Sequence, residues 1–121
     1  MTAAGRLLIV DDNEDLCEAM CLLASDEGFE VRGVNDGRTF RAAVDDFAPD
    51  FILLDLAIPD EDGVELLAFL RDHGCKARVG IASSQPDHLL RQAGDLARAY
   101  GLDFMGALRK PFTRSEFRAF F

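Results

Sequence analysis

The chain has 121 residues, of which 49% are hydrophobic, and a formal net charge of -9 at pH 7. A chain of this length and composition can bury one core, so we expect a single domain over residues 1–121. The acidic balance argues against direct binding to nucleic acid or to an anionic membrane. No leader opens the chain and no stretch approaches the roughly 20 apolar residues of a membrane span, so we expect a cytoplasmic protein.

Apolar runs alternate with longer segments of helical period, which is the pattern of a parallel sheet with crossover helices. The predicted strands are Leu7–Val10, Val31–Val34, Phe51–Leu54, Val79–Ala82 and Phe104–Leu108. The predicted helices are Glu14–Asp26, Thr39–Phe47, Val64–Arg71, a long one from Pro86-Asp87 to Tyr100, and Thr113–Phe121. Phe51–Leu54 is apolar throughout and should be central, whereas the more polar Val31–Val34 suits an edge. We therefore predict an α/β fold with a five-stranded parallel sheet.

Charged residues follow three of these strands. Asp11-Asp12 ends the first strand, Asp55 ends the third, and Lys110 follows the fifth. Ligands of open parallel sheets bind beyond the carboxyl ends of the strands, so these side chains should converge on one crevice. Three carboxylates beside one ammonium suit a divalent cation such as Mg²⁺, for which Asp12 and Asp55 are the expected direct ligands and Asp11 an expected ligand through water.

With these motifs in order, the chain resembles the receiver domain of two-component response regulators over essentially its whole length. The resemblance rests on the acidic pair, the phosphoacceptor, a following proline and glycine, a hydroxyl residue and a Lys-Pro-Phe signature: Asp11-Asp12, Asp55, Pro59, Gly63, Ser83 and Lys110-Pro111-Phe112. It implies a flavodoxin-like fold with strand order 2-1-3-4-5 and helices on both faces. It also adds the main-chain carbonyl of Ala57 to the Mg²⁺ ligands.

The resemblance further implies that Asp55 accepts a phosphoryl group from a phosphohistidine on a sensor histidine kinase or phosphotransfer protein. Lys110 would then pair with one phosphoryl oxygen and the Ser83 hydroxyl would donate a hydrogen bond to another. His73 and His88 lie away from the predicted pocket, so the phosphohistidine should belong to a partner. The chain would be a signalling module that catalyses its own phosphotransfer and slow dephosphorylation.

Two departures from the family pattern concern switching. The segment from Ser83 to Lys110 spans 27 residues, which is longer than the common spacing in receivers. The extra length implies a lengthened fourth helix, on a surface that many receivers use to dimerise or signal. Ala107, three residues before Lys110, replaces the aromatic ring that rotates inward in many receivers. The partner surface, including a possible homodimer, therefore stays open.

Two other classes of protein compete with this interpretation. A phosphatase of the haloacid-dehalogenase type also uses an aspartyl phosphate, but it needs an aspartate two residues after the nucleophile, and Ala57 and Asn13 stand at the two candidate positions. A phosphate-independent pseudo-receiver that acts as an interaction module is the remaining alternative. The charged residues of the pocket argue against it.

The last predicted helix closes on three aromatic rings, those of Phe117, Phe120 and Phe121. Such rings should seek a partner surface, which favours an output domain C-terminal to Phe121 over packing of the rings in this core. The segment Phe104–Phe112 also resembles receivers joined to EAL-type cyclic-di-GMP phosphodiesterases. A DNA-binding output is the next hypothesis.

Cysteine usage favours reduced thiols over a disulfide framework. Cys17 and Cys21 are four residues apart and share one face of a predicted helix, but no histidine or second cysteine pair completes zinc-type spacing. We expect both to be small apolar residues of a packed helix. Cys75 follows Gly74 in a predicted loop.

Overall fold

The computed structural model describes residues 4–58 and 61–121 of the chain. Five strands form a parallel sheet in the order β2-β1-β3-β6-β7: β1 Gly5–Val10, β2 Phe29–Val34, β3 Phe51–Leu54, β6 Arg78–Ser83 and β7 Asp103–Arg109. Numbered along the chain, this is the strand order 2-1-3-4-5, so the predicted fold is confirmed. The edge position of β2 and the central position of β3 are confirmed too.

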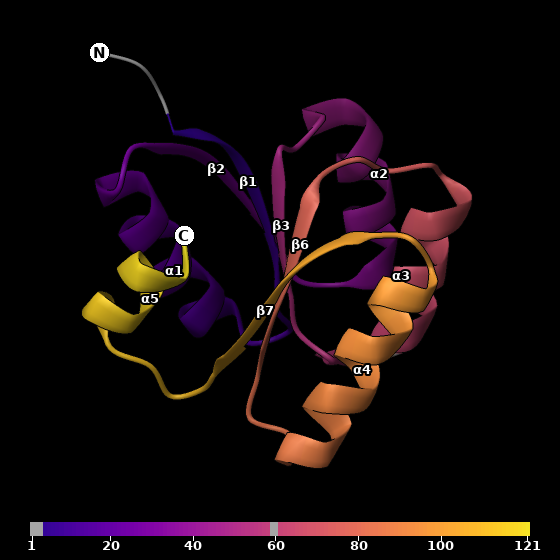
Figure 1. Cartoon of the computed structure of the whole chain (residues 1–121). Coiled ribbons are helices and arrows are strands. Elements are labelled where there is room, and N and C mark those ends of the chain that lie inside the picture. The colour runs from indigo at the N-terminus through magenta and orange to yellow at the C-terminus, as the bar shows by residue number, and fades with distance from the viewer. Residues whose placement is uncertain (1–3, 59–60) are drawn as a thin grey trace.

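The helices cover the two faces of the sheet unequally (Figure 1). One face carries α1 (Glu14–Asp26) and α5 (Arg114–Phe120), and the other carries α2 (Gly37–Phe47), α3 (Gly63–Asp72) and α4 (Asp87–Ala99). Alternate residues of a strand point to opposite faces, which explains why Leu7 and Leu8 are both fully buried but belong to different core clusters. The central strands are therefore apolar on both sides and can carry polar groups only at their ends.

The strands and helices exceed the predicted bounds by one or two residues at several ends. Ladder hydrogen bonds to a neighbouring strand extend β2 back to Phe29 and β7 forward to Arg109, which apolar runs alone do not indicate. In β7, Phe104 pairs with Val79 but Gly106 pairs with Gly80, so Met105 is an extra residue that forms a β-bulge.

The segment after Asp55 contains two short strands. Ala57–Ile58 (β4) pairs antiparallel with Glu61–Asp62 (β5). The next helix, α3, begins at Gly63, one residue earlier than predicted. Pro59, one of the residues that carried the resemblance, lies outside the described residues.

The prediction that the C-terminal rings need a partner surface is wrong, because they pack against this domain's own core. Phe117 is fully buried, and Phe120 and Phe121 are half-buried against the core beneath α5. The Phe121 ring packs edge-on against Phe29 at 5.3 Å and Phe51 at 6.0 Å between centroids. The sequence shows three apolar rings on a short helix, but it does not show that this end of the sheet leaves room for them.

The fourth helix has 13 residues, as many as α1, and begins after Pro86. Within residues 4–58 and 61–121, no helix combines the length and the apolar character needed to cross a membrane.

Candidate functional site

Three backbone hydrogen bonds carry the sheet ladder one step past the strand ends and fix the predicted site residues. The Asp11 N–H donates to the Val34 carbonyl at 3.1 Å, and the Asp55 N–H donates to the Val10 carbonyl at 3.1 Å. The Lys110 N–H donates to the Ser83 carbonyl at 3.0 Å. The sheet itself thus places these residues at one edge, as the apolar runs predicted.

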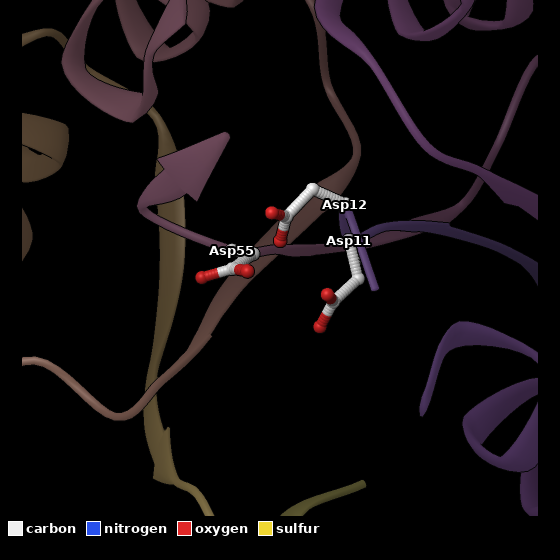
Figure 2. Close-up of side chains that lie close together, drawn as sticks. All are labelled: Asp11, Asp12 and Asp55. Carbon is white, nitrogen blue, oxygen red and sulfur yellow. The ribbon is translucent and has the colours of Figure 1, made fainter. Parts of the chain in front are cut away.

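The three aspartates meet in one place (Figure 2). Asp11 and Asp12 come from the end of β1 and Asp55 from the end of β3, and one carboxylate oxygen of each lies within 4.8 Å of the others. Asp11 and Asp55 are buried, at 1% and 5% exposure, whereas Asp12 is exposed. Buried carboxylates repel each other unless a cation compensates them, so this arrangement needs positive charge nearby.

Lys110 supplies positive charge from within the chain. Its Nζ lies 3.3 Å from Oδ2 of Asp55 and forms an ion pair with Oδ2 of Asp11. The Lys110 side chain is 11% exposed, so water screens these ion pairs only weakly. The peptide bond between Lys110 and Pro111 is cis, a feature that the Lys-Pro sequence alone does not establish.

Two asparagines donate hydrogen bonds to Asp11. Neither was predicted as a site residue. The Asn13 N–H donates to Asp11 Oδ1 at 2.9 Å, and the Asn35 side-chain amide donates to the Asp11 carbonyl at 2.9 Å. Asn13 is also the N-cap of α1, because its Oδ1 accepts from the Leu16 N–H at 3.0 Å. Asn13 could have been found as an N-cap before the acidic turn Glu14-Asp15, but Asn35 carries no local signal.

The structure separates the two neighbouring serines at the end of β6. Ser83 is fully buried, and its hydroxyl oxygen accepts a hydrogen bond from the Gln85 N–H at 3.1 Å. Ser84 is exposed and lines a cavity of about 540 Å³ together with the three aspartates and Lys110. The remaining wall of that cavity is mostly apolar and comes from α1 and from Pro111-Phe112.

The donor set suits Mg²⁺. This ion prefers hard oxygen ligands in octahedral geometry and commonly keeps several waters, which matches a cluster of carboxylates that opens to solvent on the Asp12 side. The Asp11 carboxylate is engaged by Lys110 and by the Asn13 N–H. The backbone of Ala57 lies in β4, two residues after Asp55.

Comparison with known proteins identifies the class. The family model described as "Response regulator receiver domain" matches residues 7–121, so the chain belongs to the receiver-domain family of two-component response regulators. Phosphorylation and Mg²⁺ binding at an acidic pocket are typical of that family, and in this chain Asp11, Asp12 and Asp55 form an acidic cluster.

Among curated proteins, the transcriptional regulatory protein GltR of Pseudomonas aeruginosa is 36% identical over an alignment 123 residues long. This alignment covers 98% of this chain and 48% of GltR. The regulatory protein AtoC of Escherichia coli is 30% identical over 116 residues, which cover 96% of this chain and 24% of AtoC. The chain therefore spans about half or less of the length of these relatives.

Solved structures agree with the fold. The chemotaxis response regulator CheY4 of Vibrio cholerae superposes with a TM-score of 0.83 at 25% identity, covering 98% of this chain and 95% of that chain. A response regulator from Colwellia psychrerythraea also gives a TM-score of 0.83, at 26% identity, covering 98% and 94%. In both comparisons, nearly the whole neighbour corresponds to this one domain.

Proposed function

We propose that this receiver domain accepts a phosphoryl group on Asp55 and passes the resulting change to a partner surface. The observation that carries the proposal is the ion pair of buried Asp55 with Lys110 beside two further carboxylates. An Asp55 oxygen attacks phosphorus, the bond from phosphorus to the donor's imidazole nitrogen breaks, and its electron pair leaves with the histidine. The product is an aspartyl phosphate.

The residues around Asp55 have distinct roles in this proposal. Asp12 and Asp55 would hold Mg²⁺ directly, Asp11 would hold it through water, and the main-chain carbonyl of Ala57 would add a further oxygen. When bound, the ion offsets the charge that would repel a phosphoryl group from a carboxylate. Lys110 pairs with a phosphoryl oxygen, since its ammonium already lies beside the attacking carboxylate.

Ser83 donates its hydroxyl hydrogen to a phosphoryl oxygen in this proposal. The present hydrogen bond supports that assignment, because Ser83 uses its oxygen as an acceptor from Gln85 N–H and keeps its own proton available. Ser84 is the alternative, since it lines the cavity.

The partners belong to the proposal as well. A sensor histidine kinase or a histidine phosphotransfer protein would supply the phosphoryl group. GltR and AtoC are named as regulators, and MtrA of Mycobacterium tuberculosis as a DNA-binding response regulator, which supports a DNA-binding output over the predicted EAL-type phosphodiesterase. A homodimer through the surface around α4 stays a prediction.

The test is to incubate the chain with Mg²⁺ and acetyl phosphate and to measure its intact mass. We expect a gain of about 80 Da, one phosphoryl group, in the wild type. Asp55→Asn should show no gain, while Asp50→Asn, a change at an exposed aspartate at the opposite end of β3, should behave like the wild type. An unlabelled wild type that also fails to respond to beryllofluoride would favour the pseudo-receiver.

A further inference from the structure

Two consecutive residues at the end of β2 hold the main chain of Asp11 on both sides. The Asp11 N–H donates to the Val34 carbonyl at 3.1 Å, and the Asp11 carbonyl accepts from the Asn35 side-chain amide at 2.9 Å. A carbonyl can only accept a hydrogen bond, so the Asn35 amide presents its nitrogen there. The first contact continues the sheet ladder and needs no particular side chain. The second contact depends on the asparagine.

The Asn35 contact fixes the peptide unit that joins Asp11 to Asp12. The Asp11 carbonyl is part of that planar unit, so a hydrogen bond to its oxygen restricts the rotation of the whole unit. The Asp12 side chain follows directly and is exposed, so it is not held by packing in a core. The Asp11 carboxylate accepts from the Asn13 N–H at 2.9 Å, one step further along the same turn. Asn35 therefore influences the directions in which both carboxylates point.

Asn35 is itself held between a strand end and a helix start. Val34, the residue before it, pairs with Val10 in the sheet. Asp36, the residue after it, is the N-cap of α2 and accepts from the Thr39 N–H at 2.7 Å and the Thr39 hydroxyl at 2.6 Å. A side chain between two anchored neighbours can hold a partner in place at little further cost in entropy.

We propose that Asn35 is a positioning residue of the metal site, because it holds the Asp11–Asp12 peptide in the conformation that directs both carboxylates toward a bound Mg²⁺. This inference rests on the Mg²⁺ site of the proposed function. Asn35 is not among the described residues that line the cavity beside the aspartates, so it acts on the site through Asp11.

The identity of the ion makes the role of Asn35 measurable. Mg²⁺ demands near-octahedral geometry, whereas Ca²⁺ is larger and accepts flexible arrangements of six to eight oxygen ligands. A residue that sets the direction of two carboxylates should therefore matter more for Mg²⁺ than for Ca²⁺. A residue that only stabilises the fold should not change the preference between the two ions.

The experiment titrates MgCl₂ or CaCl₂ into the folded chain and measures both affinities by calorimetry. Asn35→Ala should weaken Mg²⁺ binding about tenfold, the usual effect of losing a hydrogen bond behind a metal ligand. It should weaken Ca²⁺ binding less. Asn35→Gln keeps an amide donor and should recover part of the loss. In labelling by acetyl phosphate, the Mg²⁺ concentration for half-maximal rate should rise about tenfold in Asn35→Ala, with little change in the rate at saturating Mg²⁺.

A second measurement needs no metal. In Asn35→Ala the Asn13 N–H should exchange faster with solvent, because the Asp11 carboxylate that accepts from it is no longer fixed. Thr39→Ala is the matched control, since it removes a neighbouring side-chain hydrogen bond, the one to Asp36, and leaves the contacts of Asp11 in place. It should lower the urea midpoint without changing the Mg²⁺ affinity or the exchange of Asn13.

Three results would overturn the inference: an unchanged Mg²⁺ affinity in folded Asn35→Ala, an equal loss of Mg²⁺ affinity in Thr39→Ala, or equal weakening of Mg²⁺ and Ca²⁺. Urea midpoints establish that each variant is folded at the temperature of the titration. If the wild type itself binds no Mg²⁺, the metal site of the proposed function fails, and this result is obtained before any variant is compared.

Discussion

Nζ of Lys110 lies 3.3 Å from Oδ2 of Asp55, although the two residues are 55 positions apart in the chain. Both side chains are largely buried, at 11% and 7% exposure, and the same ammonium pairs with Asp11. Lys110 therefore forms ion pairs with two buried carboxylates at once. A bound cation would pair with the carboxylates that Lys110 now contacts, and a phosphoryl group would pair with the Lys110 ammonium.

Replacing Lys110 by Ala should destabilise the Mg²⁺-free protein by about 3–5 kcal/mol, because breaking a buried ion pair leaves a carboxylate without compensation. Mg²⁺ should then stabilise Lys110→Ala more than the wild type, since the cation takes over part of the lost charge. Urea unfolding with and without Mg²⁺ measures both effects. Lys76→Ala, which removes an exposed lysine, is the control for net charge. Equal stabilisation of Lys110→Ala and of the wild type by Mg²⁺ would contradict this account.

Asp12 should affect stability and Mg²⁺ binding in opposite directions. Asp12→Asn removes one of three clustered negative charges and should raise the stability of the Mg²⁺-free protein by about 1 kcal/mol. It should also weaken Mg²⁺ binding, because a neutral amide replaces a carboxylate ligand. Urea unfolding and a Mg²⁺ titration give the two quantities. Asp15→Asn, a change in the first turn of α1, should instead lose a small stabilising interaction with the helix dipole. If the Mg²⁺-free Asp12→Asn variant is less stable than the wild type, charge repulsion does not dominate at Asp12.

The two serines after β6 should differ in both stability and phosphorylation. Ser83→Ala removes a buried acceptor of the Gln85 N–H, which should cost about 1 kcal/mol, and should slow labelling of Asp55 by acetyl phosphate. Ser84→Ala changes an exposed side chain and should alter stability by less than about 0.5 kcal/mol. Mass spectrometry over time gives the labelling rates. Slower labelling in Ser84→Ala alone would transfer the proposed role to Ser84.

Much of this arrangement could be predicted, because a buried parallel strand is readable as an apolar run and its last residue marks the ligand edge. Asp11, Asp55 and Lys110 were placed in that way. Asn35 and the cis bond before Pro111 could not be predicted, since each depends on how separate segments meet. The aromatic C-terminus was misjudged for the same reason: its packing depends on residues that are far away in the sequence.

Gly80 and Phe120 should be energetically coupled. A Cβ at Gly80 would lie 2.7 Å from Cε2 of the Phe120 ring, so Gly80→Ala should cost about 1–3 kcal/mol through overpacking. In a Phe120→Ala background the cost should be clearly smaller, and a double-mutant cycle of unfolding free energies measures the difference. Gly28→Ala is the control, because its cost comes from a positive φ of 94° and should not depend on Phe120. Additive effects of Gly80→Ala and Phe120→Ala would mean that the ring does not fill this space in solution.

Asp36 should make α2 sensitive to acid. Its Oδ1 caps the helix by accepting from the Thr39 hydroxyl at 2.6 Å and from the Thr39 N–H at 2.7 Å, and these hydrogen bonds lower the pKa of Asp36. A carboxyl whose pKa is lower in the folded state stabilises the protein above its unfolded pKa of about 3.9 and loses that contribution as the pH falls through the folded value.

Asp36→Ala should therefore be less stable than the wild type at pH 7, with a gap that narrows as the pH falls below about 4. Asp36→Asn keeps a capping oxygen that does not titrate, so its stability should depend less on pH in this range than that of the wild type. Urea unfolding at a series of pH values measures the three proteins under matched salt. If the gap between Asp36→Ala and the wild type stays constant down to the acid limit of the fold, the charge of Asp36 does not contribute to the cap.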